Sequence, residues 1–127
     1  MTPPSSTNIA AAGLLLGRAM LAAIFILEGW SKLRGYGAAA TYMARFGVSG
    51  ALLPAVIAAE LAGGVAILVG WQTRLAASLL AVFCILAAAL FHTNFNDRSQ
   101  LLHFEKDFAI AGGLLVLAIA GPGRWSL

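Results

Sequence analysis

The stretch NIAAAGLLLGRAMLAAIFILEGWSKLRGY, residues 8–36, is a long apolar segment that carries charged residues. It is long enough to cross a bilayer, since a helix needs about 20 residues to span a hydrocarbon core roughly 30 Å thick. Arg18 lies about 13 Å from the first apolar residue, at a rise of about 1.5 Å per residue. An isolated arginine at that depth is costly, so we expect it to face protein or water and to have a partner.

Two further charges lie at the far end of the same segment. Glu28 and Lys32 are four residues apart and are therefore neighbours on one helix face. Fourteen residues separate Arg18 from Lys32, which is an angular offset of only about 40° at 100° per residue. All three charges therefore fall in one narrow sector, which we expect to point into a helix bundle.

The composition places the whole chain in the membrane class. Of its 127 residues, 61% are hydrophobic and 10% are charged, whereas soluble domains carry about 25% charged residues. The formal charge of +3 is too small and too dispersed to indicate nucleic-acid binding. Cys84 is the single cysteine, so no internal disulfide is possible. The first apolar run is too long for the core of a signal peptide, and we expect it to be retained.

Further apolar runs predict three more membrane helices. The last run, residues 108–121, is roughly 21 Å of helix and too short to span alone. This helix is therefore expected to begin earlier and to draw His103, Lys106 and Asp107 toward the membrane. The prediction is one all-α domain over residues 1–127, an integral membrane four-helix bundle with a short interfacial helix near 38–46. The spans are expected at approximately 9–31, 52–70, 75–92 and 101–121.

The distribution of basic residues predicts the orientation of the bundle. Four spans place both termini on the same side of the membrane. The two loops on the other side hold five basic residues, and the near side holds only Arg74 and Arg124. The five are Lys32, Arg34, Arg45, Arg98 and Lys106. The positive-inside rule then places both termini outside the cytoplasm.

Glu60 is the charged residue near the middle of the second span, about 12 Å from its start. Because the first two spans run antiparallel, we predict that Glu60 reaches the depth of Arg18 and pairs with it. Gly63 and Gly64 would let a neighbouring backbone come close. Small residues of this kind would also let two copies of the chain pack closely, so a homo-oligomer stays possible.

The remaining polar residues are expected at one membrane face. The first span ends there, the third ends there and the fourth begins there, which brings Glu28, Lys32, His92, Lys106 and Asp107 together. Adjacent acids and bases in a low dielectric can bind a polar headgroup or a quinone ring, or can move protons. A structural alternative stays open, in which ion pairs fix the helix register and His92 is an ordinary interfacial histidine. The two histidines lack a compact carboxylate pattern and predict no metal site, and His103 is expected to be exposed.

Four stretches together resemble the DoxX family of small bacterial inner-membrane proteins: LLLGRAMLAAIFILEGWSKLRGY, ELAGGVAILVGWQTRLAASLL, FHTNF and FEKDFAIAGGLLVLAIAGPGRWSL. The resemblance covers residues 14–127. It implies a four-helix membrane bundle and an association with respiratory redox chemistry, because the family takes its name from a terminal quinol oxidase subunit. The family's polar positions correspond here to Arg18, Glu28, Lys32, Glu60, His92 and Lys106. Asp107 stands where the resemblance leads us to expect asparagine.

Three functional hypotheses follow. The leading one is an accessory subunit of a membrane redox system that binds a quinone or a similar small molecule. Arg18 and Glu60 would anchor the molecule, and the other polar residues would form the rim. The second hypothesis is a small-solute or proton carrier, and the third is a non-catalytic membrane scaffold for soluble redox enzymes. The sequence leaves open whether the chain is an enzyme.

Overall fold

The computed structural model describes residues 4–91, 96–124 and 126. These residues form five α-helices and a short 3-10 turn, and no strand occurs among them. The elements in chain order are α1 (Pro4–Arg34), α2 (Tyr36–Arg45), η1 (Gly50–Leu52), α3 (Leu53–Val69), α4 (Thr73–Phe91) and α5 (Arg98–Ala120).

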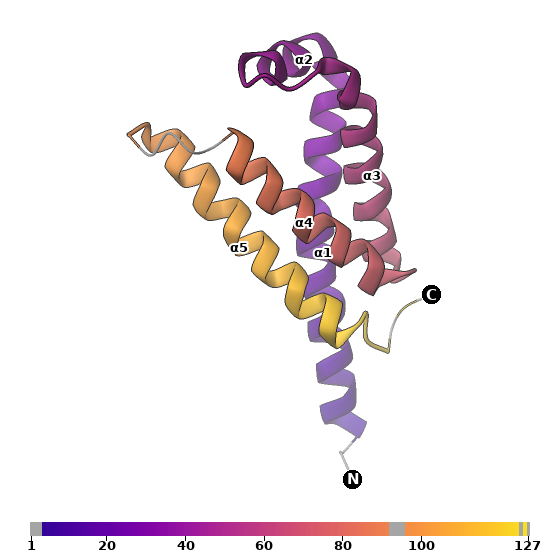
Figure 1. The fold of residues 1–127 in the computed structure, drawn as a ribbon. Helices are drawn as coiled ribbons and strands as arrows, with labels where there is room; N and C mark the ends of the chain where they lie inside the picture. The colour runs from indigo at the N-terminus through magenta and orange to yellow at the C-terminus, as the bar shows by residue number, and fades with distance from the viewer. Residues whose placement is uncertain (1–3, 92–95, 125, 127) are drawn as a thin grey trace.

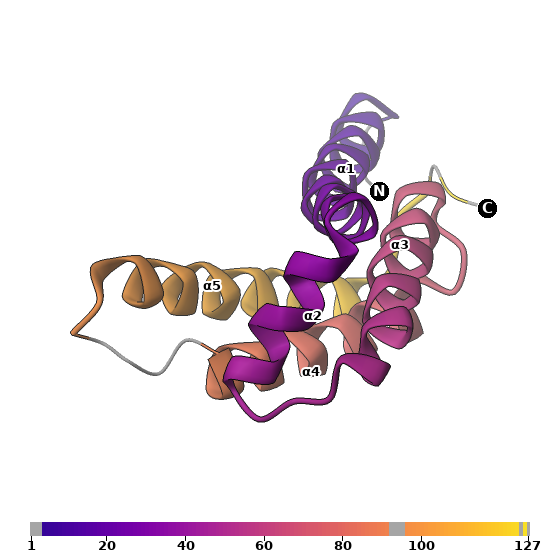
Figure 2. The ribbon, with the colours of Figure 1, turned by 90° about the horizontal axis from the view of Figure 1, so that it is seen from above.

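The four long helices form two antiparallel pairs. α1 packs chiefly on α3, and α4 packs chiefly on α5 (Figure 1). The α4–α5 pair is inclined to the α1–α3 pair, so the two pairs meet near the α3–α4 turn and diverge away from it. The short helix α2 lies across the diverging end, as the view from above shows (Figure 2). The molecule is therefore a V whose open end is covered by α2.

Glycines set the close contact between α1 and α3. A Cβ atom on Gly64 would lie 2.9 Å from Cγ1 of Ile26 and 3.3 Å from the Ala22 carbonyl oxygen. A Cβ on Gly63 would lie 2.9 Å from Leu80 on α4. The prediction that a neighbouring backbone comes close is confirmed at Gly64, whereas the atoms nearest to Gly63 belong to the Leu80 side chain.

Two apolar clusters hold the helices together. The larger one lies where the two helix pairs meet and includes Phe25, Ile67, Leu80 and Leu114. The smaller one joins α2 to α3 through Met43, Leu53 and Ile57. The predicted short helix near 38–46 is confirmed by α2. Its buried Met43 packs against α3.

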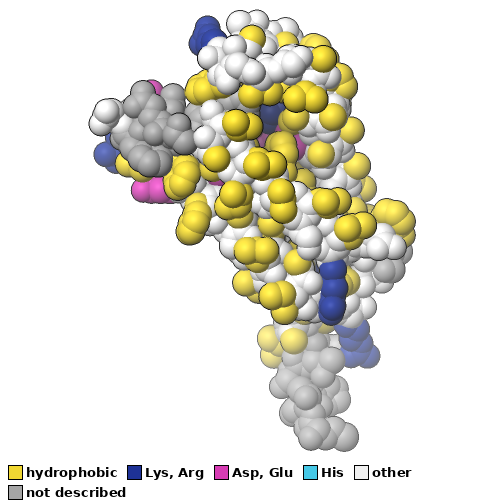
Figure 3. All heavy atoms as spheres, in the orientation of Figure 1, with side chains coloured by type: hydrophobic (Ala, Val, Ile, Leu, Met, Phe, Trp, Pro, Cys, Tyr) yellow, Lys and Arg dark blue, Asp and Glu magenta, His cyan; other side chains and the backbone are white. Residues whose placement is uncertain are grey.

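Three helical segments are long and apolar enough to cross a membrane: Asn8–Arg34, Gly50–Val69 and Thr73–Leu90. Much of the face in Figure 3 is hydrophobic, as expected of helices that contact lipid. The all-α membrane class is confirmed, but the four-helix bundle is not. α2 is a fifth helix, and the first three turns of α5 carry Arg98, Glu105, Lys106 and Asp107, which keep α5 outside the set of apolar spans.

Candidate functional site

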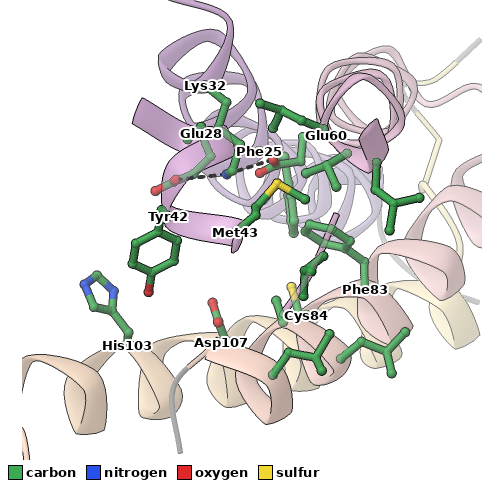
Figure 4. A pocket seen from close by; sticks show the side chains of 18 of the residues that line it. Phe25, Glu28, Lys32, Tyr42, Met43, Glu60, Phe83, Cys84, His103 and Asp107 are labelled. Atoms are coloured by element: carbon green, nitrogen blue, oxygen red, sulfur yellow. Dashed lines mark ion pairs between the residues drawn. The ribbon is translucent and has the colours of Figure 1, made fainter. Parts of the chain in front are cut away.

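A cavity of about 520 Å³ lies inside the open end of the V, beneath α2. All five helices contribute to its lining. One part of the wall is apolar and includes Phe25, Met43, Val56 and Phe83 (Figure 4). The polar lining residues are Glu28, Lys32, Tyr42, Glu60, His103, Lys106 and Asp107.

Four of these residues form an alternating series of charges, which we call the charged row: Glu60, Lys32, Glu28 and Lys106. Lys32 Nζ lies 2.8 Å from Glu60 Oε1 and 3.6 Å from Glu28 Oε2. Lys106 Nζ lies 3.9 Å from Glu28 Oε1. The side chain of Glu60 is only 3% exposed, that of Lys32 is 29% exposed and that of Glu28 is 43% exposed. The charged row therefore runs from the buried interior toward the open side of the cavity.

Glu60 reaches the interior because of the register between α1 and α3. It lies on the buried face of α3, which also holds Ile57, Gly64 and Ile67. Gly29 of α1 faces it, since a Cβ on Gly29 would lie 3.3 Å from Cβ of Glu60. Lys32 follows Gly29 by about one helical turn and therefore reaches Glu60 from the same helix face.

Lys32 Nζ and Glu60 Oε1 form a close ion pair at 2.8 Å. A buried carboxylate is costly unless a cation compensates it, and Lys32 supplies that cation. An ionised carboxylate has about four acceptor positions, so Glu60 can accept a further hydrogen bond from a donor in the cavity.

The predicted pairing of Arg18 with Glu60 is wrong. Arg18 is buried and donates hydrogen bonds to backbone carbonyl oxygens. Its Nε donates to Ile67 O at 3.0 Å and its Nη2 to Leu68 O at 2.9 Å. Its Nη1 donates to Pro122 O at 2.6 Å, in the segment that follows α5.

The register explains this difference. Because Gly29 lies opposite Glu60, Arg18 is about 16 Å further along α1 at a rise of about 1.5 Å per residue. At that level α3 ends, and the carbonyls of a helix's last turn lack intrahelical donors. The guanidinium satisfies two of those carbonyls and fixes the C-terminal segment to α3. Arg18 thus stabilises the closed end of the V, and it is not one of the described residues that line the cavity.

Five of the residues singled out from the sequence do converge. Glu28, Lys32, Glu60, Lys106 and Asp107 all line the cavity. His92 lies outside the described residues. His103, expected to be exposed, is exposed and also lines the cavity. Over residues 4–91 and 96–124, no three His, Cys, Asp or Glu side chains form a group that could hold a metal ion.

Tyr42 is a site residue that the sequence analysis missed. It lies on α2 next to the buried Met43, and it extends toward α5, where His103 and Asp107 lie (Figure 4). Burial raises the pKa of the Tyr42 phenol above its ordinary value of 10.0. Its hydroxyl therefore stays protonated at physiological pH and can donate a hydrogen bond into the cavity. The sequence signal that could have identified Tyr42 was the apolar pattern of Ala39, Ala40 and Met43, which indicates that this short helix packs against the other helices.

Comparison with known proteins places this architecture in a family. The DoxX family model matches residues 13–93, which include α1 from Gly13 onward and all of α2, η1, α3 and α4. The chain belongs to the DoxX family. This DoxX protein is 45% identical over 115 residues to inner membrane protein YqjF of Escherichia coli (strain K12), covering 91% of this chain and 88% of YqjF. It is 34% identical over 122 residues to inner membrane protein YphA of the same organism, covering 90% of this chain and 86% of YphA. No solved structure matches.

The family match includes most of the charged row of the DoxX protein. Glu28, Lys32 and Glu60 lie within residues 13–93, whereas Lys106 and Asp107 on α5 follow them. The resemblance inferred from the sequence is confirmed. The part of the site contributed by α5 completes the cavity from outside the matched region.

Proposed function

We propose that this DoxX protein is an integral inner-membrane protein that binds a small amphipathic molecule in the cavity beneath α2. One observation carries the proposal: a cavity of about 520 Å³ combines an apolar wall with a row of charged side chains. Ligand sites usually have volumes of about 300–1,000 Å³ and few polar groups in a mainly apolar lining. The inner-membrane location is supported by the names of YqjF and YphA and by the three apolar helices.

A quinone is the ligand class that suits this lining best. Its two carbonyl oxygens are acceptors, and Lys32, Lys106 and the Tyr42 hydroxyl are donors on the cavity wall. The hydroxyls of the reduced quinol are donors, and the Glu60 carboxylate has further lone pairs that can accept from them. Reduction of a quinone takes two protons and two electrons. The carboxylates and ammonium groups of the cavity can exchange the protons, and a redox-enzyme partner would carry the electrons. This division of roles makes the protein an accessory subunit.

A proton or small-solute carrier is the second candidate, favoured by the gradient of exposure along the charged row. However, the row stops at Glu60. Between Glu60 and the closed end of the V lie buried apolar side chains, including Ala22, Ile67 and Leu80, each 2% exposed or less. Because a path across the membrane would have to cross this core, binding is the better supported function.

The orientation belongs to the same proposal, with both termini on the periplasmic side. The α1 N-terminus and the α5 C-terminus lie toward the same end of the molecule (Figure 1). The end of the molecule opposite the termini holds the elements that carry Arg34, Arg45 and Arg98. The end that holds the termini has Arg74 and Arg124, so the larger number of basic residues lies on the side expected to be cytoplasmic. A reporter that is active in the periplasm should be active when it is fused to either terminus. Activity of a cytoplasmic reporter at the termini would show that the orientation is the reverse of the one proposed.

A photoreactive quinone added to the purified protein in lipid nanodiscs tests the binding proposal. We expect saturable labelling that Glu60→Gln weakens strongly. Glu105→Gln is the matched control, because Glu105 is an exposed carboxylate on α5 that does not belong to the described cavity lining. Absence of saturable labelling, or equal labelling of the folded Glu60→Gln protein, would remove the quinone from the proposal. Proton flux into liposomes that disappears in Glu60→Gln would support the carrier instead.

A further inference from the structure

A second hollow, also about 520 Å³, lies between α3 and α4. We call it the α3–α4 groove. Its α3 wall consists of Ala59, Ala62, Gly63 and Ala66, whose i, i+3, i+4, i+7 spacing puts them on one helix face. Its α4 wall consists of Leu75, Ala76, Leu79, Leu80 and Phe83, and Trp71 and Gln72 lie at the turn. None of the described residues lining it is charged.

Phe83 belongs to both hollows. It is a lining residue of the α3–α4 groove and of the cavity beneath α2, where its ring lies among the cavity side chains (Figure 4). Along α4 the groove residues end at Phe83, and the cavity residues continue from Cys84 to Leu90. The two hollows are therefore neighbours along the same pair of helices, with the Phe83 side chain at their boundary.

We propose that the α3–α4 groove receives the apolar tail of the molecule whose polar head lies at the charged row. This inference rests on the proposed function and specifies its substrate class: a ring-sized polar head with a single long apolar tail. The groove extends along α4 from Leu75 to Phe83, about 12 Å at 1.5 Å per residue. A tail of comparable length fills it.

The physical reason is the division of polarity between the two hollows. The charges lie in the cavity near α2, and the groove toward the α3–α4 turn is lined by alanine, glycine and larger apolar side chains. Small side chains on α3 leave room for a chain of methylene groups, which gains van der Waals contacts with the two helices there. The arrangement also matches a lipid in one leaflet, since the head lies toward one membrane face and the tail points along the helices toward the other.

Two probes with the same ring test the proposal: a dimethoxybenzoquinone with a decyl tail, and the same quinone without a tail. Binding of each is measured to the full chain in nanodiscs of one lipid composition. Ala62→Phe fills the groove, and we expect it to lower affinity for the decyl quinone about tenfold, because the phenyl ring displaces the tail from its packing contacts with the two helices. Affinity for the tail-less quinone should be unchanged.

Ala58→Phe is the matched control, because Ala58 is exposed on the same helix and lines neither hollow in the described part of the chain. It should leave both affinities unchanged and so correct for partition of the tail into the bilayer. Ala66→Phe, nearer the turn, provides a second groove variant if Ala62→Phe does not fold, and should affect only the decyl quinone.

The outcomes separate this inference from the proposed function. If both quinones bind and the groove variants alter neither affinity, the tail lies elsewhere and only the inference fails. Equal weakening of both quinones by the groove variants would also overturn it, because the substitutions would then act on the head site. If neither quinone binds the unmodified protein, the proposed function fails and the inference fails with it.

Discussion

Replacement of Lys32 by methionine removes the cation that compensates the buried carboxylate of Glu60. Methionine keeps much of the lysine stem's apolar volume, so the main change is the loss of the ammonium group. Lys32 Nζ is 2.8 Å from Glu60 Oε1, and the Glu60 side chain is 3% exposed. The substitution therefore leaves a charge in the interior without its ion-pair partner.

The expected cost follows from this burial. Removal of one partner of a buried ion pair costs about 3–5 kcal/mol, mainly because the other charge stays buried. Since Lys32 is 29% exposed, we expect the low end, about 3 kcal/mol of the free energy of unfolding. The contact with Glu28 adds little, because that side chain is 43% exposed and exposed pairs contribute less than about 1 kcal/mol.

A double-mutant cycle measures this directly. We expect the Lys32→Met, Glu60→Gln double variant to recover most of the loss, since the charge itself is then gone. Glu28→Gln is the control and should change stability by less than about 1 kcal/mol. Equilibrium unfolding in mixed micelles, followed by helical circular dichroism, gives the free energies. A double variant no more stable than Lys32→Met would refute the argument that an uncompensated Glu60 carboxylate causes the loss.

Three further predictions use other parts of the molecule. Arg18→Lys keeps the charge but loses the forked donors, so we expect it to lower the unfolding free energy by about 2 kcal/mol while quinone affinity, measured separately, is unchanged. Gly64→Ala should lower the free energy of unfolding by about 1–3 kcal/mol, because the added methyl group overpacks against α1. Gly17→Ala, whose added Cβ would lie in open space, should leave the free energy of unfolding unchanged in the same unfolding experiments. Tyr42→Phe should weaken quinone binding about fivefold. That factor should be constant from about pH 6 to 9, because the raised pKa of Tyr42 keeps the hydroxyl protonated; a factor that titrates near neutrality would contradict this.

The sequence was sufficient for the helices and for part of the site. The i, i+4 spacing of Glu28 and Lys32 placed them on one face, and the structure finds that face turned toward the cavity. The apolar runs indicated the membrane helices, because length and hydropathy are local properties of the chain. Convergence of Lys106 with these residues followed from the alternating direction of the spans.

Helix register could not be predicted in the same way. The depth of Arg18 and of Glu60 was counted from the first residue of each span, which assumes that the two antiparallel helices have the same extent, so that one begins at the level where the other ends. α1 has 31 residues and α3 has 17, and α1 continues past the end of α3. Gly29 and Gly64 set the alignment through close contacts. The partners of Arg18 are backbone carbonyls, which have no signature in the sequence.

The cavity itself depends on the angle between the helix pairs. Gly70 ends α3 in the left-handed conformation, with φ of 80°, and α4 begins three residues later at Thr73. So short a connection holds one end of α3 and α4 together, while packing against α1 and α5 carries their other ends apart. No spacing of residues in the sequence indicates that divergence. Neither the cavity between the helix pairs nor the contribution of α2 to its wall was therefore predicted from the sequence.

Arg18 and Lys32, which are both on α1, differ in how freely they can change partners, and this difference bears on function. Arg18 is held at the closed end of the V by hydrogen bonds to three carbonyl groups on two segments, so its movement would unsatisfy all of them. Lys32, at the open end, has a single rotatable ammonium group and two carboxylates within reach, at 2.8 Å and 3.6 Å. A ligand that bonds to Glu60 can therefore displace Lys32 toward Glu28 without leaving the ammonium unpaired. Of these two cations, Lys32 is the one that can exchange partners in this way, and it lies at the end of the molecule that holds the cavity.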